Sequence, residues 1–191
     1  MKPSIQPCLA ALAVVLLFSG HALAAESASV EITLTGEAKP VCLLPSGSQT
    51  GGSGASFANN RVTFDTLVDD STALVKATSA QVTFPQVMCN YNGYVSVGTQ
   101  NGGLTTDGQV QDVSGNFLNK VPYKITGTWG NVAMPPLNTA TMPAGAGSVS
   151  KQAGGANRGD LILTVVTEDG TTPVLQGRYS DIIVVKVGAT Y

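Results

Sequence analysis

Short runs in which apolar and polar residues alternate recur along this chain, and they restrict it to a fold built from β-strands. Alternation with a period of two buries one face of a strand and leaves the other face in water. No stretch has the apolar spacing of an amphipathic helix bounded by caps, while Val, Thr and Gly are abundant. The sequence therefore predicts an all-β protein.

The most regular alternation covers residues 28–35 and reads Ala-Ser-Val-Glu-Ile-Thr-Leu-Thr. Its apolar residues are Ala28, Val30, Ile32 and Leu34. We expect this strand to pair with a neighbouring molecule. The alternative is an edge strand of the chain's own sheet, because short alternating strands are common.

The first 24 residues have the order of a secretory signal peptide. Lys2 is followed by an apolar run over residues 9–18 and by small residues that end at Ala24. The run is shorter than the roughly 20 apolar residues that a membrane-spanning helix needs. We therefore expect cleavage after Ala24 and export of residues 25–191.

Length and charge limit the number of domains and the kinds of partner that we expect. Residues 25–36 are expected to form an N-terminal extension, and residues 37–191 suffice for one domain with a substantial core. The formal net charge is −2, and charged residues make up only 12% of the chain. Such a chain has no basic field for nucleic acid or an anionic membrane, so neither is an expected partner.

The cysteines favour a disulfide. Cys8 leaves with the signal peptide, so Cys42 and Cys89 remain as an even pair in an exported chain. Because that chain passes through an oxidising compartment, we expect these two to be bonded. Two buried free thiols are the alternative.

Seven further runs have strand character and are separated by clusters of Gly, Asn, Asp, Ser and Pro. They cover residues 38–44, 61–67, 80–90, 94–99, 121–129, 160–167 and 178–191. Residues 46–55 are interpreted as a flexible loop, Asn92-Gly93 as a tight turn between two strands, and residues 134–159 as a long irregular stretch. Many short strands favour an immunoglobulin-like sandwich, with a closed barrel as the alternative.

The last run differs from the others because both of its faces are apolar. Residues 182–185 read Ile-Ile-Val-Val, and an odd-numbered apolar set continues to Tyr191. A strand that is apolar on both faces needs cover on both. Trp129 ends another alternating run and is interpreted as a core aromatic in preference to a sugar platform.

Catalytic patterns are missing from the sequence. His21 is the only histidine and leaves with the signal peptide, which excludes His-dependent triads and His-containing zinc sites. The carboxylates are scattered, so Asp69-Asp70 and Glu168-Asp169-Gly170 are interpreted as turns, with a weak calcium site as the alternative. No phosphate-binding glycine motif occurs. We therefore expect no enzyme, no cofactor and no small-molecule substrate.

Arg158-Gly159-Asp160 spells a tripeptide known from cell-adhesion ligands. A glycine turn that leads into the following strand explains the same letters, and tripeptides recur by chance. We therefore assign the tripeptide no role from the sequence.

In combination, these features resemble the subunits of chaperone–usher pili. The resemblance spans residues 25–191 and depends on the order of an alternating extension, Cys42, Cys89 and the segment Gly-Arg-Tyr-Ser-Asp at 177–181. The short extension and Val-Thr-Phe-Asp-Thr-Leu at 62–67 are more similar to the archaic, spore-coat-U-like branch. The classical branch has a glycine fourteenth from the end, whereas this chain has Arg178 there.

The resemblance implies an incomplete immunoglobulin-like sandwich that a donor strand from a neighbouring subunit completes. The donor residues would be the apolar set of residues 28–34, and the strand that a periplasmic chaperone pairs with would carry Tyr179, Ile183, Val185, Val187 and Tyr191. It further implies an outer-membrane usher, export to the cell surface, and a role in adhesion and biofilm formation. A self-sufficient secreted binding module, for instance for carbohydrate, is the alternative from another class.

Overall fold

The computed structural model describes residues 30–108 and 110–189, so the expected signal peptide, Ala28 and Tyr191 lie outside the described residues. The chain divides into two units, Met1–Glu37 and Ala38–Tyr191. All regular structure in the described residues is β-strand, as the alternating runs predict. The described part of the chain contains no helix that is long and apolar enough to cross a bilayer.

The largest sheet is antiparallel and is built around β5 (Thr78–Cys89), β13 (Asn157–Thr167) and β9 (Lys124–Trp129), in that order. Val, Thr and Ile are frequent in these strands and favour extended backbone. On the outer edge of β5 lie β1 and β2, and on that of β9 lie β10 and β11. The bounds of these edge strands are β1 Cys42–Leu43, β2 Ser48–Ser53, β10 Val132–Ala133 and β11 Leu137–Asn138.

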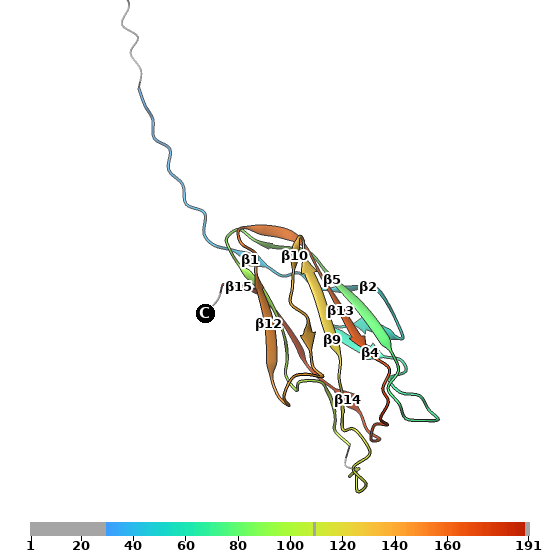
Figure 1. The fold of residues 1–191 in the computed structure, drawn as a ribbon. Helices are drawn as coiled ribbons and strands as arrows, with labels where there is room; N and C mark the ends of the chain where they lie inside the picture. Colours follow the sequence, from blue (N-terminus) through green and yellow to red (C-terminus); the bar gives the residue numbers. More distant parts are fainter. Residues whose placement is uncertain (1–29, 109, 190–191) are drawn as a thin grey trace, which may run out of the picture. The chain divides into compact units, whose positions relative to one another are not determined.

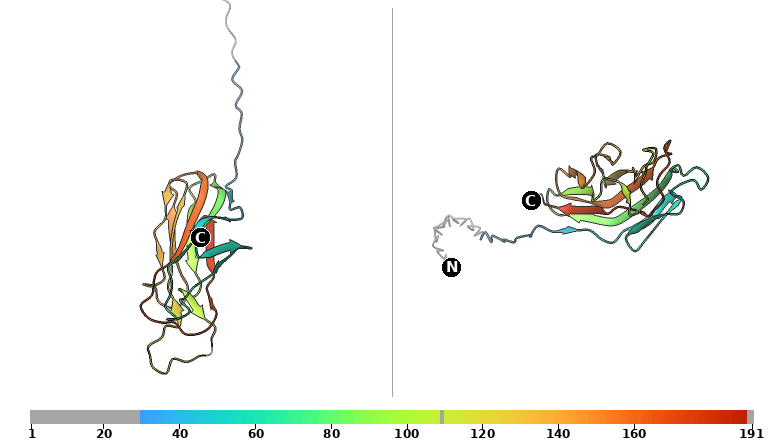
Figure 2. Two further views of the ribbon diagram at one scale, coloured as in Figure 1. Left: turned by 90° about the vertical axis from the view of Figure 1, so that its right-hand side faces the viewer. Right: turned by 90° about the horizontal axis from the view of Figure 1, so that it is seen from below.

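A second antiparallel sheet has β6 (Tyr94–Thr99) in its centre, with β12 (Gly147–Gln152) on one edge and β15 (Ile183–Gly188) on the other. Smaller sheets complete the domain (Figures 1 and 2). They are formed by β7 (Leu104–Thr106), β8 (Lys120–Val121) and β14 (Tyr179–Ser180), and by the hairpin of β3 (Ala55–Ala58) and β4 (Arg61–Phe64).

The core lies between the inward faces of the two larger sheets. Val95 and Val97 of β6 and Leu161 and Leu163 of β13 are buried in the same apolar cluster. Trp129 is fully buried there, and its indole N–H donates to the carbonyl oxygen of Val87 at 3.0 Å. The interpretation of Trp129 as a core aromatic is therefore confirmed, and the arrangement is that of an all-β, sandwich-like fold.

Several strand predictions are wrong in detail. Residues 46–55 contain β2, which pairs with β5, and residues 134–159 contain β12, which pairs with β6. Edge strands of this kind are Ser- and Gly-rich and have little apolar alternation, so pairing with a stronger strand determines them. Asn92-Gly93 does lie between β5 and β6, but these strands belong to different sheets, so the segment crosses between sheets and closes no hairpin.

The Arg158-Gly159-Asp160 tripeptide lies inside β13 and not in a turn before it. The pairing of β13 with β5 shifts after Gly159, opposite Gln86, which has a φ of 52°. Arg158 Nε donates to Gln86 Oε1 at 3.0 Å, and the Gln86 N–H donates to Asp160 Oδ1 at 2.9 Å. A Cβ at Gly159 would lie 2.9 Å from the Cα of Gly130. The three residues therefore stabilise a β-bulge, and this structural role explains why Arg, Gly and Asp occur there.

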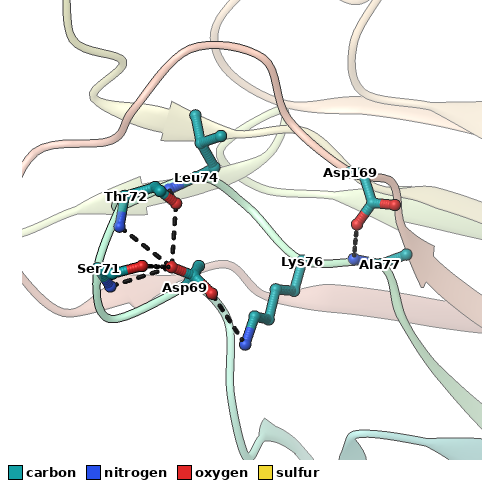
Figure 3. Close-up of polar contacts among 7 residues, drawn as sticks. All are labelled: Asp69, Ser71, Thr72, Leu74, Lys76, Ala77 and Asp169. Atoms are coloured by element: carbon teal, nitrogen blue, oxygen red, sulfur yellow. Dashed lines mark hydrogen bonds and ion pairs between the residues drawn. The ribbon is translucent and has the colours of Figure 1, made fainter.

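Carboxylates hold two loops in place (Figure 3). Residues 70–72 form a turn, as predicted for Asp69-Asp70, whereas Glu168-Asp169-Gly170 forms no turn. Asp69 Oδ1 accepts hydrogen bonds from the backbone N–H groups of Ser71 at 3.0 Å and Thr72 at 3.1 Å. Asp169 Oδ1 accepts from the N–H of Ala77 at 2.8 Å, which ties two loops together. The Ser71 hydroxyl and backbone bonds hold the pKa of Asp69 below its usual range. Within residues 30–108 and 110–189, no group of three His, Cys, Asp or Glu side chains could hold a metal.

Candidate functional site

The candidate site is the outer edge of β15. This strand pairs with β6 along one edge, from Ile183 opposite Thr99 to Gly188 opposite Tyr94. Along its other edge it pairs with no strand among the described residues. An unpaired edge presents a row of free N–H and C=O groups, which is a template for another strand.

The inward face of β15 is apolar and incompletely covered. Ile183, Val185 and Val187 pack against the core but remain half-buried. The equivalent inward side chains of β6, by contrast, include Val95 at 0% and Val97 at 1% exposure. The inward side chains of β15, the strand with the unpaired edge, are therefore less buried than those of its neighbour β6.

The same margin of the domain includes β1. The elements β1 and β15 lie next to each other although they belong to different sheets (Figure 1). Cys42 of β1 and Phe84 of β5 are also half-buried against the core. The half-buried apolar side chains thus extend across the margin between the two sheets. A strand added at β15 would cover this margin.

The outward face of β15 is also partly apolar. Val184 is 41% exposed, and Ile182, just before the strand, is 57% exposed. A shallow hollow of about 380 Å³ lies over this face of the sheet, and Lys186 is the one charged residue that lines it.

Tyr179 fixes the segment that leads into β15. Its hydroxyl donates to the carbonyl oxygen of Leu175 at 2.7 Å and lies 3.3 Å from that of Leu118. Burial raises the pKa of the phenol. A tyrosine that bonds back to the backbone four residues upstream, just before a late strand, is similar to the tyrosine corner of immunoglobulin-like sandwiches.

Asp181 fixes the end of the free-edge strand to the turn that follows β6. Its carboxylate accepts hydrogen bonds from the Thr99 hydroxyl, from the Tyr123 hydroxyl at 2.8 Å, and from the N–H groups of Asn101 at 2.9 Å and Gly103 at 3.0 Å. Burial alone would raise the pKa of Asp181, but the bonds from Thr99, Tyr123 and the two backbone groups outweigh it and lower the pKa. The sequence offers no signal for this cluster beyond the segment 177–181 itself.

We expect Asp181→Asn to destabilise the domain by about 1–3 kcal/mol at pH 7, because the amide cannot accept from all of these donors. The lowered pKa of Asp181 means that its contribution is complete above the unfolded value of about 4 and is lost as pH falls through the folded value. Thermal unfolding at pH 7 and pH 3 measures both effects. The variant should lose less stability on acidification than the parent, and an equal loss would contradict this role.

The described part of the extension, residues 30–37, forms no strand. Its three large apolar side chains are exposed, at 85% for Val30, 77% for Ile32 and 90% for Leu34. The fourth expected donor residue, Ala28, lies outside the described residues, as does Tyr191 at the other expected site.

The expected disulfide is confirmed. Cys42 and Cys89 are bonded, with 4.2 Å between their Cα atoms, and they lie opposite each other in the pairing of β1 with β5. Asn90 continues this pairing, because its N–H donates to the Val41 carbonyl at 3.1 Å. The bond therefore anchors the short β1 to the central strand, at the margin shared with β15.

Replacing Cys42 by Ser should lower the stability of the domain and, since we expect the chain to be exported, the yield of exported protein. The bond closes a loop with a sequence separation of 47. For a loop of that length the chain-entropy model gives a loss of up to about 4 kcal/mol. Thermal unfolding of the variant, of the parent and of the parent in reductant measures this loss, and equal midpoints for all three would contradict it.

Comparisons with protein-family models, with curated proteins and with solved structures return no match. The structure itself therefore defines the class: an all-β protein of antiparallel, sandwich-like sheets with one apolar strand edge left open in the described residues.

Proposed function

We propose that this chain is a structural subunit of a surface pilus that is assembled by donor-strand exchange along a chaperone–usher pathway. The apolar row of residues 28–34 in one copy adds a strand to the free edge of β15 in the next copy. A periplasmic chaperone holds that edge before assembly, and an outer-membrane usher joins the subunits. The resulting fibre serves adhesion and biofilm formation at the cell surface.

The observation that carries this proposal is the strand order. An immunoglobulin-like sandwich places its strands in the orders A-B-E-D and C-F-G. In this domain β1, β5, β13 and β9 follow the first order, and β6 and β15 pair as C and F do. In the described part of the chain no strand takes the position of G. The half-buried residues Ile183, Val185 and Val187 border that position, which supports an incomplete sandwich.

Strand addition fits the chemistry of both partners. Main-chain hydrogen bonds to the free edge supply affinity, and alternate side chains supply specificity. The extension offers exposed apolar side chains at every second position, and the domain offers a partly covered apolar face. The extension and the open edge of the domain therefore match each other: both have apolar side chains at every second position.

The direct test uses the domain without its extension and the extension as a synthetic peptide. We expect the peptide of residues 25–36 to raise the unfolding midpoint of residues 37–191, because a ligand that binds only the folded state stabilises it. The matched control is the same peptide with Ile32→Asp. A domain that is stable, monomeric and indifferent to both peptides would instead support the self-sufficient binding module.

A further inference from the structure

The loop between β7 and β8 and the strand β1 lie at opposite ends of the domain (Figure 1). Each of these segments carries a small apolar surface. The turn patch consists of Val113, Phe117 and Leu118, which are 97%, 44% and 40% exposed. The β1 patch consists of Val41 and Leu43, which are 42% and 52% exposed. Neither patch is part of the free edge of β15.

The turn patch is held in a fixed shape. Asp112 Oδ1 accepts from the N–H groups of Ser114 at 2.9 Å and Gly115 at 2.8 Å, and Asp112 Oδ2 accepts from the N–H of Phe117 at 2.7 Å. Leu118 is tied to the domain through its own N–H, which donates to the Pro173 carbonyl at 2.9 Å. A preorganised apolar turn loses little entropy when it binds a partner.

The β1 patch is defined by the pairing of β1. Cys42 points inward because it is bonded to Cys89, and successive side chains of a strand point to opposite faces. Val41 and Leu43 therefore point outward together. Along the chain they follow the extension within a few residues.

The direction of a donor strand decides which end of one subunit meets the next. All strand-to-strand pairings in the described sheets are antiparallel, and antiparallel pairs are the more stable kind. A donor antiparallel to β15 has Val30 toward Gly188 and Leu34 toward Ile183. The domain that belongs to the donor strand then follows at the Ile183 end of β15. The Tyr179 hydroxyl lies at this same end, close to Leu118. A donor parallel to β15 would instead bring the incoming chain to the Gly188 end. The extensions of both copies would then lie at the same end of the receiving domain.

The connection between the donor and its domain is short. The chain from Leu34 to Cys42 spans at most about 28 Å when fully extended. The β1 end of the incoming domain must therefore stay near the Ile183 end of the subunit that receives its strand. This end carries the turn patch.

From these observations we infer that the turn patch of each subunit docks on the β1 patch of the subunit whose extension it receives. This second contact is heterologous, with different surfaces on the two copies, so it repeats along an open filament. It rests on the proposed function, because the donor strand sets its geometry. It orients successive domains, whereas the inserted strand joins them.

The experiment places the photo-crosslinking residue p-benzoylphenylalanine at Val113 or at Phe117 in the full chain, expressed with its chaperone and usher. After irradiation, SDS-resistant multimers are heated to release inserted strands, and covalent dimers are mapped by mass spectrometry. We expect dimers linked to the segment 38–44, with several-fold more product than from the same residue at Ser150, which is exposed on β12.

The outcomes separate the two proposals. Multimers without covalent dimers, or dimers linked to a segment other than 38–44, would overturn the docking of the two patches and leave strand exchange intact. If the parent forms no multimers at all, strand exchange fails and the docking fails with it. Equal product from Ser150 and from the turn patch would also overturn the docking.

Discussion

Replacing Ile32 by Asp is expected to abolish the SDS-resistant multimers that the proposed donor-strand exchange would form. Burying the three large apolar side chains of the extension contributes about 5–9 kcal/mol before ordering costs. An Asp in the central position removes about a third of that sum. In the proposed register it also places a charge against the inward row Ile183, Val185 and Val187 of the next copy. Electrophoresis of unheated and heated samples, after expression with chaperone and usher, measures the multimers.

The matched control is Thr33→Asp, one residue further along. Because side chains of a strand alternate in direction, this charge faces solvent when Ile32 faces the domain. Multimers from Thr33→Asp should equal those of the parent. Both variants should still fold and accumulate, since residues 30–37 form no strand and their large apolar side chains are exposed. Ladders of equal intensity from Ile32→Asp and the parent would refute insertion in this register.

Deleting residues 187–191 is expected to abolish the periplasmic accumulation that the proposed pathway requires. The deletion removes Val187, which lies opposite Val95 in the pairing of β15 with β6 and packs against the core. Val95 is fully buried in the intact domain, and exposing a Val side chain costs about 1.5–3 kcal/mol. The deletion also shortens the strand that a chaperone would pair with in the proposed pathway. Immunoblots of periplasmic extracts measure accumulation.

Val184→Thr serves as the control for this deletion. Val184 lies on the outward face of β15, so the substitution keeps the length of the strand and its inward row. Its accumulation should match that of the parent. Normal accumulation of the truncated protein would count against chaperone pairing at β15 and against the pilus proposal as a whole.

Strands with clear alternation were predictable from the sequence. The expected strand at 94–99 has the bounds of β6, and those at 80–90 and 160–167 differ from β5 and β13 by a few residues. β-Branched residues and burial of one face favour the extended backbone in these segments locally. The disulfide was predictable too, because an even pair of cysteines in a chain that is expected to be exported has few alternatives.

Weak strands and the polar contacts were not predictable. β2 and β12 are rich in Ser and Gly, and they become strands through pairing with β5 and β6. The Asp181 carboxylate accepts hydrogen bonds from residues 99–103 and from Tyr123, which are far from it in sequence. No local sequence pattern therefore predicts this cluster. The bulge that Arg158 and Asp160 hold depends on Gln86 of another strand in the same way.

The sequence by itself predicted that this protein is all-β, that Cys42 and Cys89 are bonded, and that residues 182–185 are apolar on both faces. Only the tertiary structure decided which side of β15 is paired, which apolar row faces the core, and which edge stays open in the described residues. The physical reason is that a strand's period depends on its own residues, whereas its neighbours depend on hydrogen bonds and packing between segments distant in the chain.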